Sequence, residues 1–119
     1  MGHTKVKAVV ANPLERARRK EVELLADTGA IYSMLPGSVL RDLGIAPSGR
    51  RRFRLASGDV EEYPTGEAYM AIEGVGATSV VVFGAEGSTP LLGVTTLELL
   101  GMQVDPVTGK LKPMELLLL

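Results

Sequence analysis

Apolar and polar residues alternate along several stretches of the chain, and this alternation predicts β-strands. Successive side chains of a strand point to opposite faces, so a period of two places the apolar residues on one buried face. Glycine, serine and proline residues separate the stretches, as they do in turns between strands. The predicted strands cover residues 5–11, 21–26, 52–56, 60–63, 67–73 and 78–83. The pattern therefore predicts a mostly β chain.

Two short segments carry helix boundaries instead. In residues 36–44, Ser38 is the predicted N-cap and Gly44 ends the helix, and residues 95–101 end in the same way at Gly101. Helices this few and this short cannot cover both faces of a parallel sheet. We therefore expect an all-β fold, a closed or semi-closed barrel with one or two short helices. At 119 residues the chain is expected to form a single domain, 1–119.

Composition and charge exclude several classes of protein. The chain is 45% apolar and 23% charged, which is typical of a globular protein and not of a disordered one. Its 13 basic and 14 acidic residues give a net charge of −1, so no overall attraction to nucleic acid or to an anionic membrane is expected. Cysteine is absent and the N-terminal residues show no export signal. A cytoplasmic protein that binds neither nucleic acid nor membrane is predicted.

Four consecutive leucines, residues 116–119, form an apolar run at the C-terminus. The run is far shorter than the ~20 residues that a membrane-spanning helix needs. We expect it to be a strand or an anchor that packs on this chain or on a partner. A truncated hydrophobic tail is the alternative.

An acid interrupts the apolar pattern at the end of the second predicted strand. The stretch LLADTGA, residues 24–30, places Asp27 directly after apolar residues and before Thr28 and Gly29. Its carboxylate is therefore expected at the edge of the core, beside a glycine that leaves room for the backbone. One interpretation is an ordinary surface turn, because Asp-x-Gly is common in turns. The other interpretation is a functional acid.

Further motifs follow this acid in a fixed order. The stretch LLADTGAIYSMLP precedes a short helix that ends in LGI, the glycine-bearing hairpin RLASGDV follows, and PLLGVTTLELLGMQVDPVTGKLKP comes last. In this combination and order the chain resembles the retroviral-type, or retropepsin-like, single-domain aspartic proteases of bacteria and archaea. The resemblance extends over residues 6–113, nearly the full chain. It implies an acid-protease barrel that hydrolyses peptide bonds.

The resemblance also assigns roles to individual residues. The catalytic aspartate matches Asp27. The active-site loop, which locks to its counterpart across a dimer, matches Thr28, Gly29 and Ala30. A second motif packs beside that loop, with plain core packing as its other interpretation, and matches Leu91, Leu92 and Gly93. The flap that closes over bound peptide, with an ordinary hairpin tip as the alternative, matches Ala56, Ser57, Gly58 and Asp59.

A homodimer follows from the number of aspartates. The chain has four, and only Asp27 stands in a Thr-Gly context. Peptide hydrolysis of this type needs two such acids, so the second must come from another copy of the chain. The resemblance thus implies a homodimer that acts on a peptide or protein, without metal or cofactor. Ile31 departs from the family, in which a small or polar residue is common there, whereas Ser33 fits the usual Ser or Thr.

Other functions find less support in the sequence. A noncatalytic dimerisation or peptide-binding module with the same fold is the alternative to a protease. The single histidine, His3, gives little basis for a Ser-His-Asp triad or a histidine metal site. The stretch Gly74-Val75-Gly76 lacks the third glycine of a dinucleotide-binding motif and is predicted to be a hairpin turn. Solvated faces are predicted for the basic clusters 16–20 and 50–54 and for Glu61 and Glu62.

Overall fold

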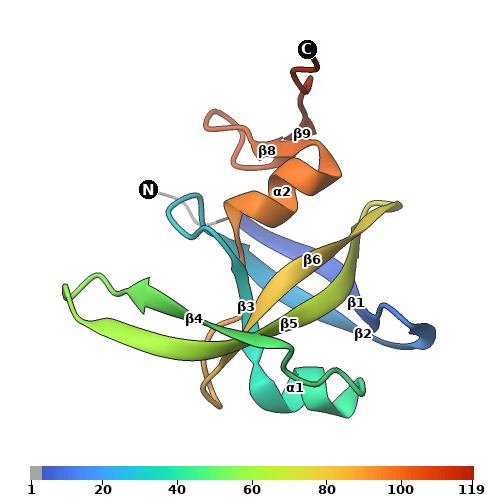
Figure 1. Ribbon diagram of the computed structural model, residues 1–119. Helices are drawn as coiled ribbons and strands as arrows, with labels where there is room; N and C mark the ends of the chain where they lie inside the picture. The colour runs from blue at the N-terminus through green and yellow to red at the C-terminus, as the bar shows by residue number, and fades with distance from the viewer. Residues whose placement is uncertain (1–3) are drawn as a thin grey trace.

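The computed structural model describes residues 4–119, which form mainly β-strands with two short helices (Figure 1). The strands are β1 (Thr4–Asn12), β2 (Glu15–Ala26), β3 (Ser33–Pro36), β4 (Gly49–Arg54), β5 (Val60–Ile72), β6 (Val75–Gly84), β7 (Leu91–Leu92), β8 (Met102–Val104) and β9 (Leu111–Pro113). The helices are α1 (Gly37–Asp42) and α2 (Val94–Leu100). The predicted all-β fold with one or two short helices is confirmed. His3 lies outside the described residues, so the structure does not bear on it.

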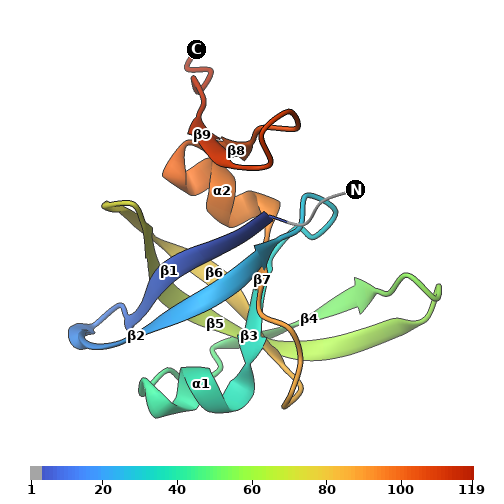
Figure 2. The ribbon, with the colours of Figure 1, turned by 180° about the vertical axis from the view of Figure 1, so that it is seen from behind.

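Six of the strands close into a ring. The main sheet has the order β1-β2-β7-β3-β6-β5-β4, and β1 also pairs with β5 through Val9–Ala71, Val10–Met70 and Ala11–Tyr69. This second pairing closes the sheet. β4 lies outside the ring and pairs with the first half of β5 (Figure 2). Closure satisfies the backbone groups that an open sheet would leave unpaired at its edges. The predicted closed or semi-closed barrel is therefore present.

Apolar side chains fill the interior of this ring, and the two helices cover its opposite ends (Figure 1). Along β1 the buried residues alternate with more exposed ones, as the sequence pattern predicted. The side chains with no exposed surface include Val10, Leu24, Leu35, Leu40, Met70, Val81 and Leu92. These residues come from both helical and strand segments, so the barrel has one continuous core.

The observed strands differ at their ends from the predicted ranges: β1 and β6 are longer, β4 begins at Gly49 and ends at Arg54 instead of at residue 56, and β2 and β5 differ most. β2 begins at Glu15 and includes the basic cluster 16–20, which is exposed on both faces and therefore shows no alternation. β5 joins the predicted strands 60–63 and 67–73 and passes through Pro64. Proline has no N–H to donate and is tolerated in a strand where one side has no partner. Pro64 meets this condition because β4 lies opposite it, while the pairing with β6 begins only at Thr65.

The predicted cap of the first helix is wrong. Residue Pro36 occupies the N-cap position of α1 and no side chain of the helix itself caps it. Glu86, from the loop after β6, instead accepts a hydrogen bond of 3.0 Å from the Ser38 N–H and another from the Ser38 hydroxyl. Gly44 has a φ of +79°, as expected for the residue that ends the helix, and Gly101 ends α2 with a φ of +67°.

Glu86 is expected to stabilise the fold in a pH-dependent way. The hydrogen bonds from the Ser38 hydroxyl and amide, together with the charge of Arg41, hold the pKa of Glu86 below its usual value of 4.5. A lowered pKa in the folded state means that the contribution is complete above pH 4.5 and is lost as the pH falls through the folded-state value. We expect Glu86→Gln to lower the melting temperature at pH 7 and to have no effect in strong acid. Thermal unfolding of this variant and of the exposed control Glu67→Gln, followed over the pH range, measures this; a difference that does not change with pH would contradict it.

The predictions for the chain's turns and its C-terminal end need correction. The turn between β5 and β6 is formed by Glu73 and Gly74, with φ of +51° and +82°, and Val75 already belongs to β6. The leucines 116–119 form no strand, and each of them exposes more than half of its surface. The prediction that they pack on this chain is therefore wrong, and the prediction that they pack on a partner stays a prediction. Within residues 4–119, no helix has both the length and the apolar character to cross a membrane.

Candidate active site

The loop that carries Asp27 crosses over the end of a strand inserted from far along the chain. β2 and β3 follow one another in sequence but do not pair, because β7 lies between them. β7 runs parallel to β2, with Leu25 opposite Leu91, and antiparallel to β3, with Met34 opposite Leu91. Residues 27–32 must therefore span the width of β7. This geometry fixes the loop at both of its ends.

Asp27 is held by backbone groups of its own loop and of β7. Its N–H donates to the Leu92 carbonyl at 3.0 Å, and its own carbonyl accepts the Ala30 N–H at 3.0 Å. One carboxylate oxygen, Oδ1, accepts the Gly29 N–H at 2.9 Å. The side chain is half-buried, so the other oxygen remains available at the surface of the loop. The acid is thus oriented by backbone groups, and no cation among residues 4–119 forms an ion pair with it.

The second motif lies directly against this loop. The Val94 N–H donates to the Ala30 carbonyl and the Thr95 N–H donates to the Ile31 carbonyl, both at 2.9 Å. Gly93 has an ordinary φ of −90°. A Cβ atom on Gly93, however, would lie 2.4 Å from the carbonyl carbon of Tyr32, which is far inside van der Waals contact. Glycine is required here by the close approach of the two backbones.

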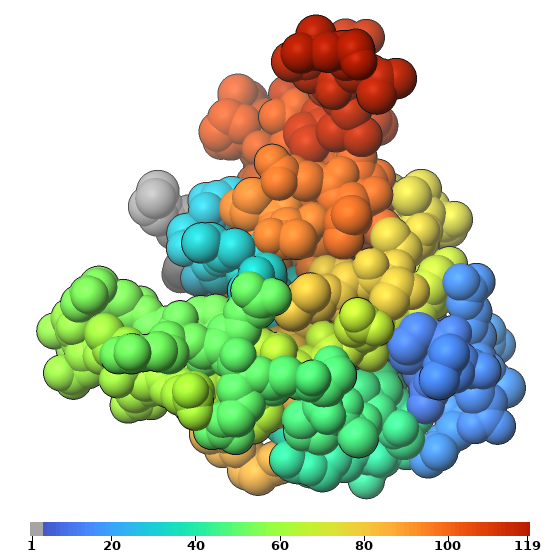
Figure 3. All heavy atoms as spheres, viewed as in Figure 1, coloured from blue at the N-terminus to red at the C-terminus, as the bar shows by residue number. Residues whose placement is uncertain are grey.

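The hairpin of β4 and β5 carries the residues predicted to form the flap. The Leu55 N–H donates to the Asp59 carbonyl at 2.8 Å, and the Gly58 N–H donates to the Leu55 carbonyl at 2.9 Å. Gly58 has a φ of +93°, a conformation that favours glycine. Ala56, Ser57, Gly58 and Asp59 therefore form the tip of a hairpin that projects from the barrel (Figure 3).

Aromatic side chains connect this hairpin to the Asp27 loop, a contact that the sequence did not reveal. Tyr32, two residues after Ala30, meets Phe53 of β4 edge-to-face with 6.0 Å between the ring centroids. Phe53 in turn lies 6.0 Å from Tyr63 of β5, and the Arg51 guanidinium lies 5.7 Å from the Tyr32 ring. The Tyr63 hydroxyl donates to Glu61, and this hydrogen bond raises the pKa of Tyr63.

The charged residues of the hairpin are exposed, as predicted. Glu61 and Glu62 both face solvent, and Arg50 donates to Glu62 at 2.7 Å. This ion pair joins side chains that are each more than half exposed, so it adds little to stability. It does hold two charges of opposite sign on one face of the hairpin.

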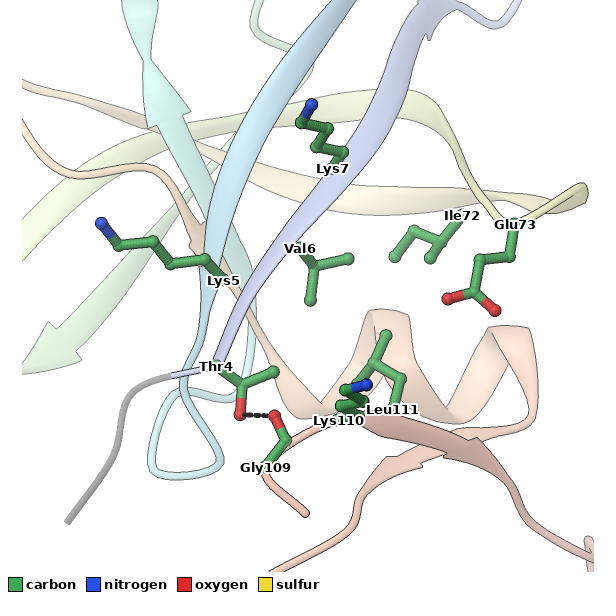
Figure 4. Close-up of a pocket in the computed structure, with 9 residues that line it drawn as sticks. All are labelled: Thr4, Lys5, Val6, Lys7, Ile72, Glu73, Gly109, Lys110 and Leu111. Carbon is green, nitrogen blue, oxygen red and sulfur yellow. Dashed lines mark hydrogen bonds between the residues drawn. The ribbon is translucent and has the colours of Figure 1, made fainter.

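Two hollows adjoin the barrel wall near β1 and β2. One, of about 360 Å³, lies beside the last residues of β2 before Asp27 and is lined by Lys5, Glu23, Leu24, Leu25, Thr89 and Pro90. The other, of about 310 Å³, separates β1 from the β8–β9 hairpin (Figure 4). There Val6, Ile72 and Leu111 point inward, Lys5 and Lys7 point away, and the Thr4 hydroxyl donates to the Gly109 carbonyl. Glu73 and Lys110 also line this second hollow, so its wall carries charged as well as apolar side chains.

The six-stranded ring, the acid on a loop that crosses an inserted strand, and the projecting hairpin together define the class of single-lobe acid proteases. The chain belongs to the family described as gag-polyprotein putative aspartyl protease, whose model matches residues 16–103. The resemblance noted in the sequence is thereby confirmed. Comparison with curated proteins gave no match.

Solved structures share this fold. The protease of simian foamy virus (mac), in solution, superposes with a TM-score of 0.58 at 14% identity, covering 80% of this chain and 92% of the other. The EIAV protease complexed with the inhibitor HBY-793 has a TM-score of 0.58 at 17% identity, covering 87% and 93%. A retropepsin-like aspartic protease from Rickettsia conorii has a TM-score of 0.55 at 21% identity, covering 87% and 77%. The shared architecture is therefore the retropepsin fold.

Proposed function

We propose that the protein is an aspartic endopeptidase that acts as a homodimer, with Asp27 from each of two copies forming the catalytic dyad. The observation that carries this proposal is the environment of Asp27 in a chain of the aspartyl protease family. Its carboxylate is half-buried, accepts the Gly29 N–H at 2.9 Å and sits on the loop that crosses β7. One chain supplies one such acid, so the second comes from a twofold-related copy.

Two carboxylates face to face provide the acid and the base that peptide hydrolysis needs. They share one proton because ionising both at short range is unfavourable, and aspartic proteases are the established example of this behaviour. The ionised carboxylate takes a proton from water, which attacks the peptide carbonyl, while the protonated one donates to the carbonyl oxygen. We therefore expect kcat to depend on pH with a bell shape, whose limbs belong to the pair.

The remaining motifs provide the dimer contact and the substrate cleft in this proposal. Thr28 is exposed next to Asp27, where its hydroxyl is available to the loop of the second copy. The tip residues 56–59 close as a flap over an extended peptide, which adds to the hairpin as a strand. The hollow lined by Leu25 and Pro90 receives a substrate side chain beside the acid. The leucines 116–119 contribute to the interface between the copies.

Cleavage of a denatured protein at mildly acidic pH tests this proposal. We expect fragments to appear, a statine-type inhibitor to block them, and light scattering to show a dimer at micromolar concentration. Specific activity is also expected to fall on dilution as the dimer dissociates. Exposure of 68% of Ile31, at a position where the family has smaller or polar residues, leaves a noncatalytic peptide-binding module as the competing function. Peptide binding without cleavage at every pH tested would favour that module, and a monomer at all concentrations would exclude the dyad.

A further inference from the structure

Three buried hydroxyl groups from distant parts of the chain meet behind the active-site loop. Ser33 of β3 and Thr96 of α2 have no exposed surface, and Ser79 of β6 is 2% exposed. Burying a hydroxyl group is unfavourable unless it is hydrogen-bonded, and an apolar side chain of the same size would pack there without that requirement. The three residues therefore call for an explanation beyond filling the core.

The three hydroxyls form one directed chain of hydrogen bonds. These contacts allow one arrangement in which every hydroxyl proton has an acceptor: Ser79 donates to the Val80 carbonyl at 3.2 Å and accepts the proton of Thr96, whose oxygen lies 2.8 Å away. Thr96 has only one hydroxyl proton, so across the 2.6 Å contact with Ser33 it is the acceptor and Ser33 is the donor. The Ser33 oxygen in turn accepts the Gly93 N–H at 2.9 Å. Each of the three hydroxyl groups therefore has a hydrogen-bond partner for its proton, and Thr96 lies between Ser33 and Ser79.

The series of hydroxyl hydrogen bonds ends at Gly93, in the segment that supports the proposed catalytic loop. Gly93, which donates to Ser33, follows Leu92, whose carbonyl accepts the Asp27 N–H at 3.0 Å. The next two amides, of residues 94 and 95, donate to the carbonyls of Ala30 and Ile31 at 2.9 Å. Residues 92–95 thus hold the Asp27 loop at its beginning and toward its end, and the hydroxyl chain fixes residues 92–95 to β3 and β6.

We propose that Thr96, with Ser33 and Ser79, positions Asp27 for catalysis. This inference rests on the proposed function and deepens it, since it assigns three positioning residues that do not touch the substrate. The hydroxyl chain restrains the Leu92 carbonyl and the Gly93 amide, and through them the backbone of the acid. Catalytic groups must be held within a fraction of an ångström for full rate, so loss of this restraint acts on turnover more than on substrate binding.

Thr96→Val is the principal test, because valine keeps the shape of threonine and removes the hydroxyl. It leaves Ser33 without an acceptor and Ser79 without a donor. We expect kcat per inhibitor-titrated active site to fall by about 10- to 100-fold while KM changes less than about 3-fold. Thr96→Ser, which keeps the hydroxyl, is the matched control and should stay within about 3-fold of the wild-type kcat. A Thr96→Val enzyme with wild-type kcat, or one whose activity falls only in proportion to its folded dimer, would overturn the proposal.

Amide hydrogen exchange provides a second readout that does not need activity. In Thr96→Val the increase in exchange rate at the amides of Asp27 and Gly93 should exceed by at least about 10-fold any increase at Val10, a fully buried residue whose exchange reports global unfolding. Unchanged exchange at Asp27 and Gly93 would refute the restraint. If the wild type cleaves nothing, the proposed function fails and exchange alone decides this inference. Should Thr96→Val fail to fold, Ser79→Ala replaces it, with the same expected direction in both measurements.

Discussion

Asp27→Asn is expected to abolish peptide hydrolysis, with kcat falling by at least about 10³-fold. Asparagine has the size of aspartate and can accept the Gly29 N–H through its amide oxygen, so the loop geometry should be kept. It cannot take a proton from water or share one with a facing carboxylate. The loss is therefore expected in turnover, with the fold and the dimer retained. Cleavage assays, light scattering and circular dichroism of the purified variant measure these three properties.

Mixing wild-type and Asp27→Asn subunits gives a sharper result. If each active site uses one Asp27 from each copy, only dimers with two wild-type subunits cut, so activity falls with the square of the wild-type fraction. A half-and-half mixture at equilibrium should then retain about a quarter of the activity, as the square law gives. Asp42→Asn, at an exposed position at the end of α1, is the matched control and should leave activity unchanged. A linear dependence on the wild-type fraction would mean that one subunit is sufficient.

Gly93→Ala is expected to have the largest effect on folding. The new Cβ atom would lie 2.4 Å from the Tyr32 carbonyl carbon and 2.8 Å from the Ser33 nitrogen, both of them backbone atoms that cannot move aside as a side chain can. This clash is relieved only if the segment that follows β7 and the Asp27 loop move apart. We expect the free energy of unfolding to fall by about 3 kcal/mol, with a melting temperature lower by roughly 10 °C. Denaturant and thermal unfolding measure both quantities.

Gly49→Ala is the matched control for this substitution. Gly49 also lies in extended backbone, in β4, but its added Cβ would meet only the Thr65 hydroxyl at 3.4 Å, an ordinary contact. Its stability should stay within about 1 kcal/mol of the wild type. Equal stabilities of the two variants would show that β7 and the loop can move apart freely, and this would also weaken the case for a precisely supported Asp27.

The local parts of the fold could be predicted from the sequence. Alternation located β1 and β6, and Gly44 and Gly101 marked the ends of the two helices. The short strands β3 and β7 have four and two residues, too few for a period of two to be visible. The cap of α1 comes from Glu86, 48 residues beyond Ser38, so no local pattern could have revealed it. Contacts of this kind depend on how the chain closes.

The candidate site also has one part that the sequence predicted and another that it did not. The motif around Asp27 indicated the acid, and the resemblance supplied the second motif that lies against it. The aromatic contact between Tyr32 and Phe53 and the hydroxyl chain through Thr96 join residues far apart in sequence. Aromatic and hydroxyl-bearing residues are common in strands and short helices, so composition and spacing did not indicate that these residues contact one another.

The insertion of β7 between β2 and β3 also has a consequence for the order of folding. Leu25 pairs with Leu91, which is far from it in sequence. Such long-range pairings form late because distant segments must first be brought together. During synthesis on the ribosome, the loop with Asp27 emerges long before the strand that supports it. A nascent chain therefore carries Asp27 in an unformed setting until β7 has emerged, and the proposed dyad cannot form before then.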